Sequence, residues 1–274
     1  MKLYNISLLR RIFLPLLRRF NLGDITIRHH YTGDPVRLHS FRHKGYWYHG
    51  RRREQETMLL FRRLLRPGDS VIEVGGHIGY LSLYFKWLVQ SGNVFVFEPG
   101  VNNLPYIRRN VLPRGIQLVE KAVGDRNGPE TFFLESLTGQ NNSFVPNFKE
   151  LQYNVKNAHA GGPAVTEVTV EMVRLDDFIN THSIKPELVK IDVEGFELTV
   201  LKGMTETMGR CFPKIMVEVQ TDEEKIFNLL SASGYTLFNS QCLVCSRPVE
   251  LRGNIFGLHS EYHRGIISEL KAHA

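Results

Sequence analysis

The residues best suited to chemistry in this sequence of 274 residues surround a glycine-rich turn. The turn reads Glu73-x-Gly75-Gly76-His77-x-Gly79. A dinucleotide-binding turn needs glycine at three fixed positions, and here His77 and Tyr80 stand at the second and third. An acid two residues before the first glycine would repel a pyrophosphate, but it can pair with an ammonium group. The turn therefore argues against a dinucleotide and for a ligand that carries a positive charge.

A second acid, Glu98, follows Glu73 after 25 residues, at the end of the next apolar segment. A carboxylate at that place can accept both hydroxyls of a ribose. An ammonium group and a ribose without a phosphate together describe S-adenosylmethionine. The alternative interpretation is a tight turn from strand to helix, flanked by acids that are simply solvated.

Three further carboxylates are candidates for a group-transfer step: Asp192, Glu194 and Glu218. Methyl transfer to a hydroxyl needs alignment, which is worth about 7–11 kcal/mol, and removal of a proton, which a positioned base accelerates about 10²–10⁴-fold. We expect Asp192 to be that base, or to bind Mg²⁺ together with Glu218, with Glu194 and Lys190 in support. The alternative is that Lys190 and Asp192 only pair with each other, while Glu194 caps the next helix.

The segments that position these acids alternate between short apolar runs and helical periodicity. Strands are predicted at 70–74, 94–97, 116–120, 188–191 and 214–218, and candidate antiparallel strands that close the sheet at 235–238 and 254–258. The segments between them are predicted to be mostly helical, which implies right-handed crossovers and a largely parallel sheet. In such an α/β sheet ligands bind beyond the carboxyl ends of the strands, where the acids at 73, 98, 192 and 218 fall.

Composition places the chain among ordinary globular proteins, with 42% hydrophobic and 23% charged residues. The sequence has no apolar run of about 18 residues, so we predict no membrane-spanning helix. Its three cysteines, Cys211, Cys242 and Cys245, suit a reducing compartment, and we expect a cytoplasmic protein. The Cys242-x-x-Cys245 pair lacks the second pair that a zinc site needs.

Positive charge is concentrated near the N-terminus. Residues 1–66 hold 15 Lys and Arg against 4 Asp and Glu, whereas the remainder has a net charge of −5. Residues 1–20 are predicted to form a basic amphipathic helix that packs on the main domain or contacts a membrane peripherally. Residues 25–49, rich in histidine and aromatic side chains, predict short strands and a candidate lid rather than a metal site. We expect a basic N-terminal extension over 1–50 and one cofactor-binding domain over 51–274.

Several blocks resemble the FkbM family of S-adenosylmethionine-dependent methyltransferases. They are residues 71–79, 96–99, 189–197, 201–203 and 217–219, in the family's order and within roughly 54–258. The resemblance implies a class I, Rossmann-like methyltransferase fold with a mostly parallel seven-stranded sheet and helices on both faces. It also implies O-methylation of sugars, polyketides or similar products. The family typically has Ala-Asn where this chain has Gly76-His77, and since His77 can still donate one hydrogen bond, we expect cofactor binding to survive.

The same resemblance assigns cofactor contacts to residues of this chain. It gives the methionine end to Glu73, Gly75 and Gly79, the ribose to Glu98, and the adenine to Asp125 with the backbone around Ala122 and Val123. Gly76 and His77, in the same turn, are further candidate contacts of the cofactor. The basic N-terminus lies outside the resemblance.

We therefore expect O-methylation of a hydroxyl on a glycan, a sugar or a secondary metabolite, with a lipid-linked glycan among the candidate acceptors. Residues 140–143 carry amides and a hydroxyl that either read sugar hydroxyls or form a solvated turn. The alternatives are an RNA methyltransferase anchored by the basic N-terminus, and a non-catalytic binding module. An acidic catalytic face disfavours nucleic acid, and the presence of Glu73, Glu98 and Asp192 disfavours the module. The sequence leaves the oligomeric state and the metal dependence open.

Overall fold

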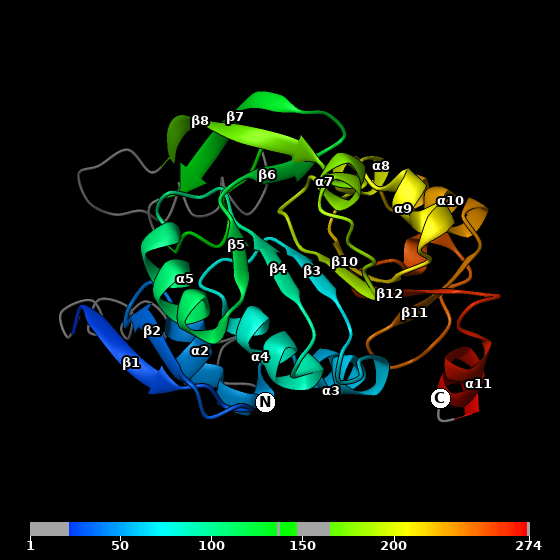
Figure 1. Ribbon diagram of the computed structural model, residues 1–274, viewed down its shortest axis with the longest axis horizontal. Coiled ribbons are helices and arrows are strands. Elements are labelled where there is room, and N and C mark those ends of the chain that lie inside the picture. Colours follow the sequence, from blue (N-terminus) through cyan, green and yellow to red (C-terminus); the bar gives the residue numbers. More distant parts are fainter. Residues whose placement is uncertain (1–21, 136–137, 147–164, 273–274) are drawn as a thin grey trace.

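The computed structural model describes residues 22–135, 138–146 and 165–272 (Figure 1). The helix predicted over residues 1–20 lies outside the described residues. Within the described ranges no helix is both long enough and apolar enough to cross a membrane.

A seven-stranded sheet forms the centre of the molecule, in the order β11-β12-β10-β9-β3-β4-β5. Its strands are β3 (Val71–Val74), β4 (Val94–Phe97), β5 (Gln117–Val119), β9 (Leu188–Ile191), β10 (Lys214–Val219), β11 (Tyr235–Asn239) and β12 (Gly253–His259). Strands β10, β9, β3, β4 and β5 pair in parallel, and β12 runs antiparallel between β10 and β11. The predicted parallel sheet with antiparallel closing strands is confirmed.

Helices cover both faces of this sheet (Figure 1). Helices α3 (Gln55–Leu64), α4 (Tyr80–Val89), α5 (Leu104–Val111) and α11 (Arg264–Ala272) contribute to one apolar cluster, and α7 (Leu175–Thr181), α8 (Glu197–Lys202), α9 (Thr205–Arg210) and α10 (Glu223–Ala232) to the other. Short 3₁₀ turns follow at Leu112–Arg114 and Pro248–Glu250. All four residues of β3, β4 and β9 are buried, as expected for strands covered on both faces.

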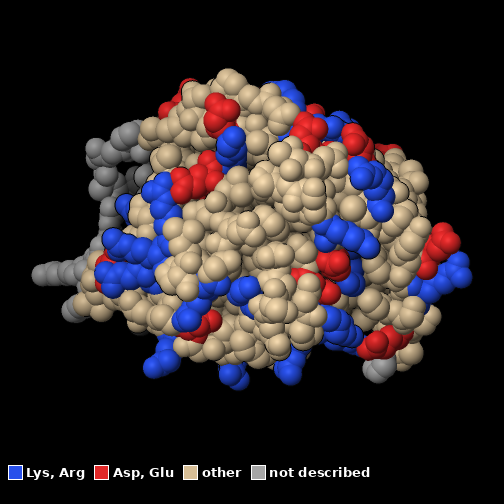
Figure 2. Space-filling view, viewed as in Figure 1, with Lys and Arg blue, Asp and Glu red and all other residues tan. Residues whose placement is uncertain are grey.

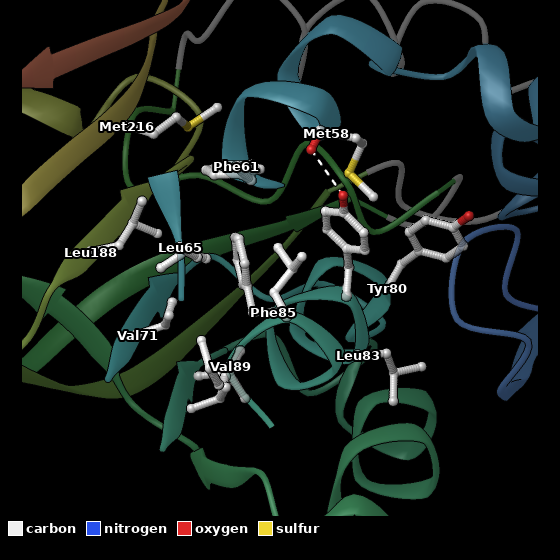
Figure 3. Packing of buried hydrophobic residues seen from close by; sticks show 14 of the residues in the cluster. Met58, Phe61, Leu65, Val71, Tyr80, Leu83, Phe85, Val89, Leu188 and Met216 are labelled. Carbon is white, nitrogen blue, oxygen red and sulfur yellow. Dashed lines mark hydrogen bonds between the residues drawn. The ribbon is translucent and has the colours of Figure 1, made fainter. Parts of the chain in front are cut away.

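Packing between α3 and α4 is visible in Figure 3. The ring of Phe61 meets that of Phe85 edge-on, with 4.8 Å between their centroids. The hydroxyl of Tyr84 donates a hydrogen bond to the carbonyl of Met58. These contacts fix α3 to α4, the helix that begins directly after the glycine turn.

A second sheet forms part of the connection between residues 120 and 188, which also contains α7. It consists of β6 (Ala122–Gly124), β8 (Val165–Arg174) and β7 (Gly128–Glu135), in the order β6-β8-β7. The prediction of mostly helical segments is wrong here. Strands β7 and β8 bury one face against a small cluster around Phe132 and expose the other, so their apolar signal is weak.

The N-terminal region begins with a hairpin of β1 (Asp24–Arg28) and β2 (Pro35–His39), which confirms the short strands predicted there. It continues through α2 (Lys44–His49) and a 3₁₀ turn, η2 (Gly50–Arg52). Val36 and Leu38 are fully buried in the cluster that also contains α3, α4 and α5. The side chain of Asn110 on α5 accepts a hydrogen bond from the N–H of Arg37 and donates to the carbonyls of Arg37 and Ile78. The hairpin is thereby tied both to α5 and to the glycine turn.

Candidate active site

A cavity opens beyond the carboxyl ends of β3, β4, β9 and β10. Its walls include ten of the predicted site residues: Glu73, Gly75, Gly76, His77, Glu98, Val123, Lys190, Asp192, Glu194 and Glu218. The structure does not place Gly79 or Asp125 on these walls. The topology thus brings together side chains from positions more than one hundred residues apart in the sequence.

Close approach of neighbouring strands explains the glycines of the turn. Gly75 has a φ of 83°, and a Cβ on it would lie 1.9 Å from the carbonyl oxygen of Asp192. A Cβ on Gly76 would lie 2.3 Å from a methyl group of Val96. Gly79 precedes α4 with a φ of 79°, and a Cβ there would meet Val111 on α5. The first two glycines shape the cavity wall, and the third packs α4 against α5.

Lys190 lies between the carboxyl groups of Asp192 and Glu73 at the cavity wall and is 1% exposed. Its Nζ donates to the carbonyl oxygen of Gly75 at 2.8 Å and lies 3.1 Å from Asp192 Oδ2 and 3.8 Å from Glu73 Oε1. Burial opposes its positive charge, but Asp192 and Glu73 outweigh burial and raise the pKa of Lys190. The Lys190–Asp192 pair named as an alternative is therefore present, and Asp192 faces the cavity as well.

Asp192 and Glu218 share a hydrogen bond and differ in charge. Burial opposes ionisation of Asp192, yet the charge of Lys190 and the hydrogen bond from Glu218 lower its pKa. The negative charge of Asp192, followed by burial, raises the pKa of Glu218 to about 10. At neutral pH Glu218 is thus a protonated donor, and Asp192 is the ionised carboxylate, with 33% of its side chain exposed.

Glu73 and Glu98 are buried, and burial raises the pKa of each to about 7. Glu73 accepts a hydrogen bond from Ser82 of α4. Glu98 accepts hydrogen bonds from the N–H groups of His77 and Gly100 and from the amide of Asn103. Both acids therefore fasten the glycine turn and its neighbours to the ends of β3 and β4.

His77 has a φ of 51° and is engaged on both ring nitrogens. Its Nδ1 lies 3.0 Å from the hydroxyl of Tyr46, and its Nε2 lies 3.4 Å from the carbonyl oxygen of Thr138. Burial lowers the pKa of His77 well below its usual value, so the ring is neutral. The backbone N–H of His77 already has an acceptor, because it donates a hydrogen bond to Glu98.

Tyr46 and Arg53 also line the cavity, although neither was expected to be a site residue. The Arg53 guanidinium lies over the Tyr46 ring, 4.4 Å from its centroid. Tyr46 belongs to residues 25–49, the candidate lid, and this was the available signal. Arg53 lies outside that segment, between η2 and α3. A one-dimensional pattern does not show that α2 faces the glycine turn.

Residues 140–143 also line the cavity. Asn142 accepts hydrogen bonds from the N–H of Glu135 and from Asn102, and Ser143 donates to the carbonyl oxygen of Glu194. The segment is thus held in place by its own side chains.

Two further acids lie as follows. Asp125 is not among the residues that line the cavity, its side chain is exposed and lies 3.8 Å from that of Arg126, and its contact with the adenine stays a prediction. Glu194, for which a helix cap was the alternative role, is not the N-cap residue of the next helix, because α8 begins at Glu197 with Phe196 as its N-cap. Cys211, Cys242 and Cys245 are free thiols.

A magnesium site is not formed by the residues proposed for it. Within the described ranges, no group of three or more His, Cys, Asp or Glu side chains is arranged to hold a metal ion. Asp192 and Glu218 are occupied by Lys190 and by each other. Their arrangement does not fit a divalent cation, and no step below depends on one.

The known proteins to which this chain is similar are methyltransferases. A model of the methyltransferase FkbM domain matches residues 73–272. Methyltransferase 1 of Beauveria bassiana is 24% identical over 184 residues, which are 62% of this chain and 74% of the relative. Hexuronic acid methyltransferase AglP of Haloferax volcanii is 28% identical over 182 residues, 66% of this chain and 69% of the relative. The crystal structure of an FkbM methyltransferase from Methylobacillus flagellatus gives a TM-score of 0.45 at 18% identity, over 73% of this chain and 50% of that one.

Proposed function

The chain belongs to the family of FkbM-domain methyltransferases, and from this premise we propose that it methylates a hydroxyl group of a sugar, glycan or secondary metabolite. S-adenosylmethionine is the proposed methyl donor. The observation that supports this best is the ionised Asp192, held by Lys190 and Glu218 on the wall of the cavity. A carboxylate in that state can receive the proton that a hydroxyl loses.

The residues around the cavity fit S-adenosylmethionine. The acids Glu73 and Asp192 suit its positive charges, and Glu98 suits its ribose. The absence of Cβ atoms at Gly75 and Gly76 lets the turn lie directly against β9 and β4 and makes a smooth wall for the methionine end. When bound, the cofactor supplies a methyl group already activated by a sulfonium, so the protein has only to align the acceptor and manage one proton.

Asp192 is a weak base, because its pKa is lowered, and a weak base is sufficient here. The hydroxyl oxygen becomes much more acidic as it forms its bond to the methyl carbon, so the proton passes to Asp192 late in the reaction. Lys190 keeps Asp192 ionised and oriented, and the protonated Glu218 donates a hydrogen bond to it. Asp192 is the proposed base, and Lys190 and Glu218 are positioning residues.

The polar groups on the remaining walls favour an acceptor rich in hydroxyls. Gln140, Glu54 and Asn254 line the cavity and offer both donors and acceptors. A relative named as a hexuronic acid methyltransferase supports a sugar acceptor for this chain. A nucleic acid is disfavoured, because its phosphates would meet the carboxyls of this cavity.

Ligand binding by the purified chain tests the cofactor. We expect S-adenosylmethionine and S-adenosylhomocysteine to raise the melting temperature, and NAD to have no effect, because a ligand that binds only the native state stabilises it by mass action. Transfer of a radiolabelled methyl group to a panel of sugars, uronic acids and lipid-linked glycans then tests the acceptor. A folded chain that binds neither adenosyl ligand would overturn the proposal.

A further inference from the structure

Glu98 has less free capacity for a ribose than its position at the end of β4 suggests. Its Oε1 accepts hydrogen bonds from the N–H of Gly100 at 2.8 Å and from Nδ2 of Asn103 at 3.1 Å. Its Oε2 accepts from the N–H of His77 at 2.7 Å. A carboxylate accepts about four hydrogen bonds, so roughly one position remains, whereas a ribose presents two hydroxyls. One of those hydroxyls needs an acceptor other than Glu98.

Asn103 lies beside Glu98 and has an acceptor to spare. The residue is 2% exposed, and its Nδ2 donates both to Glu98 and to the carbonyl oxygen of Gly139. Its Oδ1 is buried and has no hydrogen-bond partner among the residues that the structure describes. The amide cannot be reversed, because its oxygen would then face a carboxylate and a carbonyl.

The surroundings of this oxygen point to a ligand. Asn103 precedes α5 at the position where asparagine usually caps a helix, yet its side chain caps nothing. It lines the same cavity as Glu98. Gly139, with a φ of 74°, lies directly against Oδ1, since a Cβ on it would be 2.3 Å from that oxygen. A buried acceptor without a partner costs free energy that a bound donor would recover.

We infer that Asn103 completes the ribose site: its Oδ1 accepts the hydroxyl hydrogen bond for which Glu98 has no room, while its Nδ2 holds Glu98 in place. This inference rests on the proposed function, since it presumes an adenosyl cofactor. The site then divides the two ribose hydroxyls between a carboxyl and an amide.

Calorimetric titration of the full chain with S-adenosylhomocysteine and with its 2′-deoxy and 3′-deoxy analogues tests the inference. The wild type should lose about tenfold in affinity when the hydroxyl received by Asn103 is removed. Asn103→Ala should bind S-adenosylhomocysteine about tenfold more weakly and should no longer distinguish it from that one analogue. The matched control Asn102→Ala, which removes a neighbouring amide bonded to Glu135 and Asn142, should keep the wild-type pattern.

A purely structural Asn103 gives a different result, because Asn103→Ala would then weaken all three ligands by the same factor. That outcome overturns the inference and leaves the proposed function standing. Failure of the wild type to bind S-adenosylhomocysteine overturns the proposed function itself. If Asn103→Ala does not fold, the wild type decides: a loss of affinity with each of the two deoxy analogues supports the inference, whereas a loss with only one of them shows that the second hydroxyl has no acceptor and overturns it.

Discussion

Neighbouring charges and burial together determine which carboxyls of the site are charged. Asp192 is ionised because Lys190 lies 3.1 Å away, whereas Glu218 next to it keeps its proton. Glu73 and Glu98 titrate near pH 7 because they are buried. The sequence alone does not show which acids of the site are ionised. Their surroundings in the folded chain determine this.

The first prediction separates the proposed base from its partner. Asp192→Asn should lower kcat about 10²–10⁴-fold, because the variant cannot take the proton of the acceptor. Glu218→Gln should lower kcat less than about tenfold, because its amide can donate a hydrogen bond to Asp192 as the protonated acid does. Single-turnover transfer of the labelled methyl group measures both. Equal losses in the two variants would contradict the assignment of Asp192 as the base.

The second prediction concerns stability and pH. The pKa of Glu218 is raised from 4.5 to about 10 in the folded chain. Between these values the folded chain holds a proton that the unfolded chain releases, so this group makes the chain less stable as pH rises. Glu218→Gln removes that titration, and its stability relative to the wild type should therefore increase between about pH 5 and pH 8. Urea denaturation at several pH values measures this difference.

The control for this series is Glu171→Gln, which removes a carboxyl from an exposed position on β8. A difference between Glu218→Gln and the wild type that stays constant with pH would show that Glu218 is ionised in the folded chain.

At the scale of secondary structure, the glycine turn is dictated by the strands that approach it. A Cβ on Gly75 would lie 1.9 Å from a backbone oxygen of β9's carboxyl end, and its φ of 83° is itself unfavourable for other residues. Gly115 has a φ of 68° but no neighbour within 4 Å of such a Cβ. The two glycines therefore differ only in the clash.

The third prediction uses this pair. Gly75→Ala should lower the free energy of unfolding by at least about 3 kcal/mol, because backbone strain and overpacking add. Gly115→Ala should cost only about 1–2 kcal/mol, from its backbone conformation. Chemical denaturation monitored by circular dichroism compares them. Equal costs would mean that the turn relaxes away from Asp192 without difficulty.

The same scale shows what a sequence can and cannot reveal. Strands such as Val94–Phe97 were predictable because they are buried on both faces and read as continuous apolar runs. The second sheet was missed because the first half of Gly128–Glu135 has no buried residue, so its apolar pattern is weak, and because its partner strand Val165–Arg174 is distant in the sequence. Tyr46 was not expected at the site for a related reason, since its role depends on how α2 packs against the glycine turn. Arg53 lies at the site through its contact with the ring of Tyr46. Asn103 shows its spare acceptor only once its hydrogen bonds are known.

At the scale of the whole molecule, charge sets the N-terminal region apart from the remainder, whereas packing joins it to the core. Figure 2 shows Lys and Arg side chains along the lower edge of the molecule, where Figure 1 places the hairpin, α2 and α3. The charge distinguishes this region from the remainder, whose net charge is −5. The packing does not, because Val36 and Leu38 belong to the same core as α3, α4 and α5. The charge count divides the chain after residue 66 and therefore does not mark the predicted boundary between residues 50 and 51. Whether that boundary is one of folding can be tested.

The fourth prediction is that both sides of this boundary unfold together. The chain has two tryptophans, Trp47 on α2 and Trp87 on α4, so Trp47→Phe and Trp87→Phe each leave one reporter on one side. Their fluorescence should change at the same urea concentration, because the hairpin shares the core and is tied to α5 by Asn110. Leu38→Ala, which empties a fully buried position, should lower both midpoints and cost about 2–5 kcal/mol. An earlier transition at Trp47 alone would make the extension a separate unit, free to move over the site without unfolding the domain beneath it.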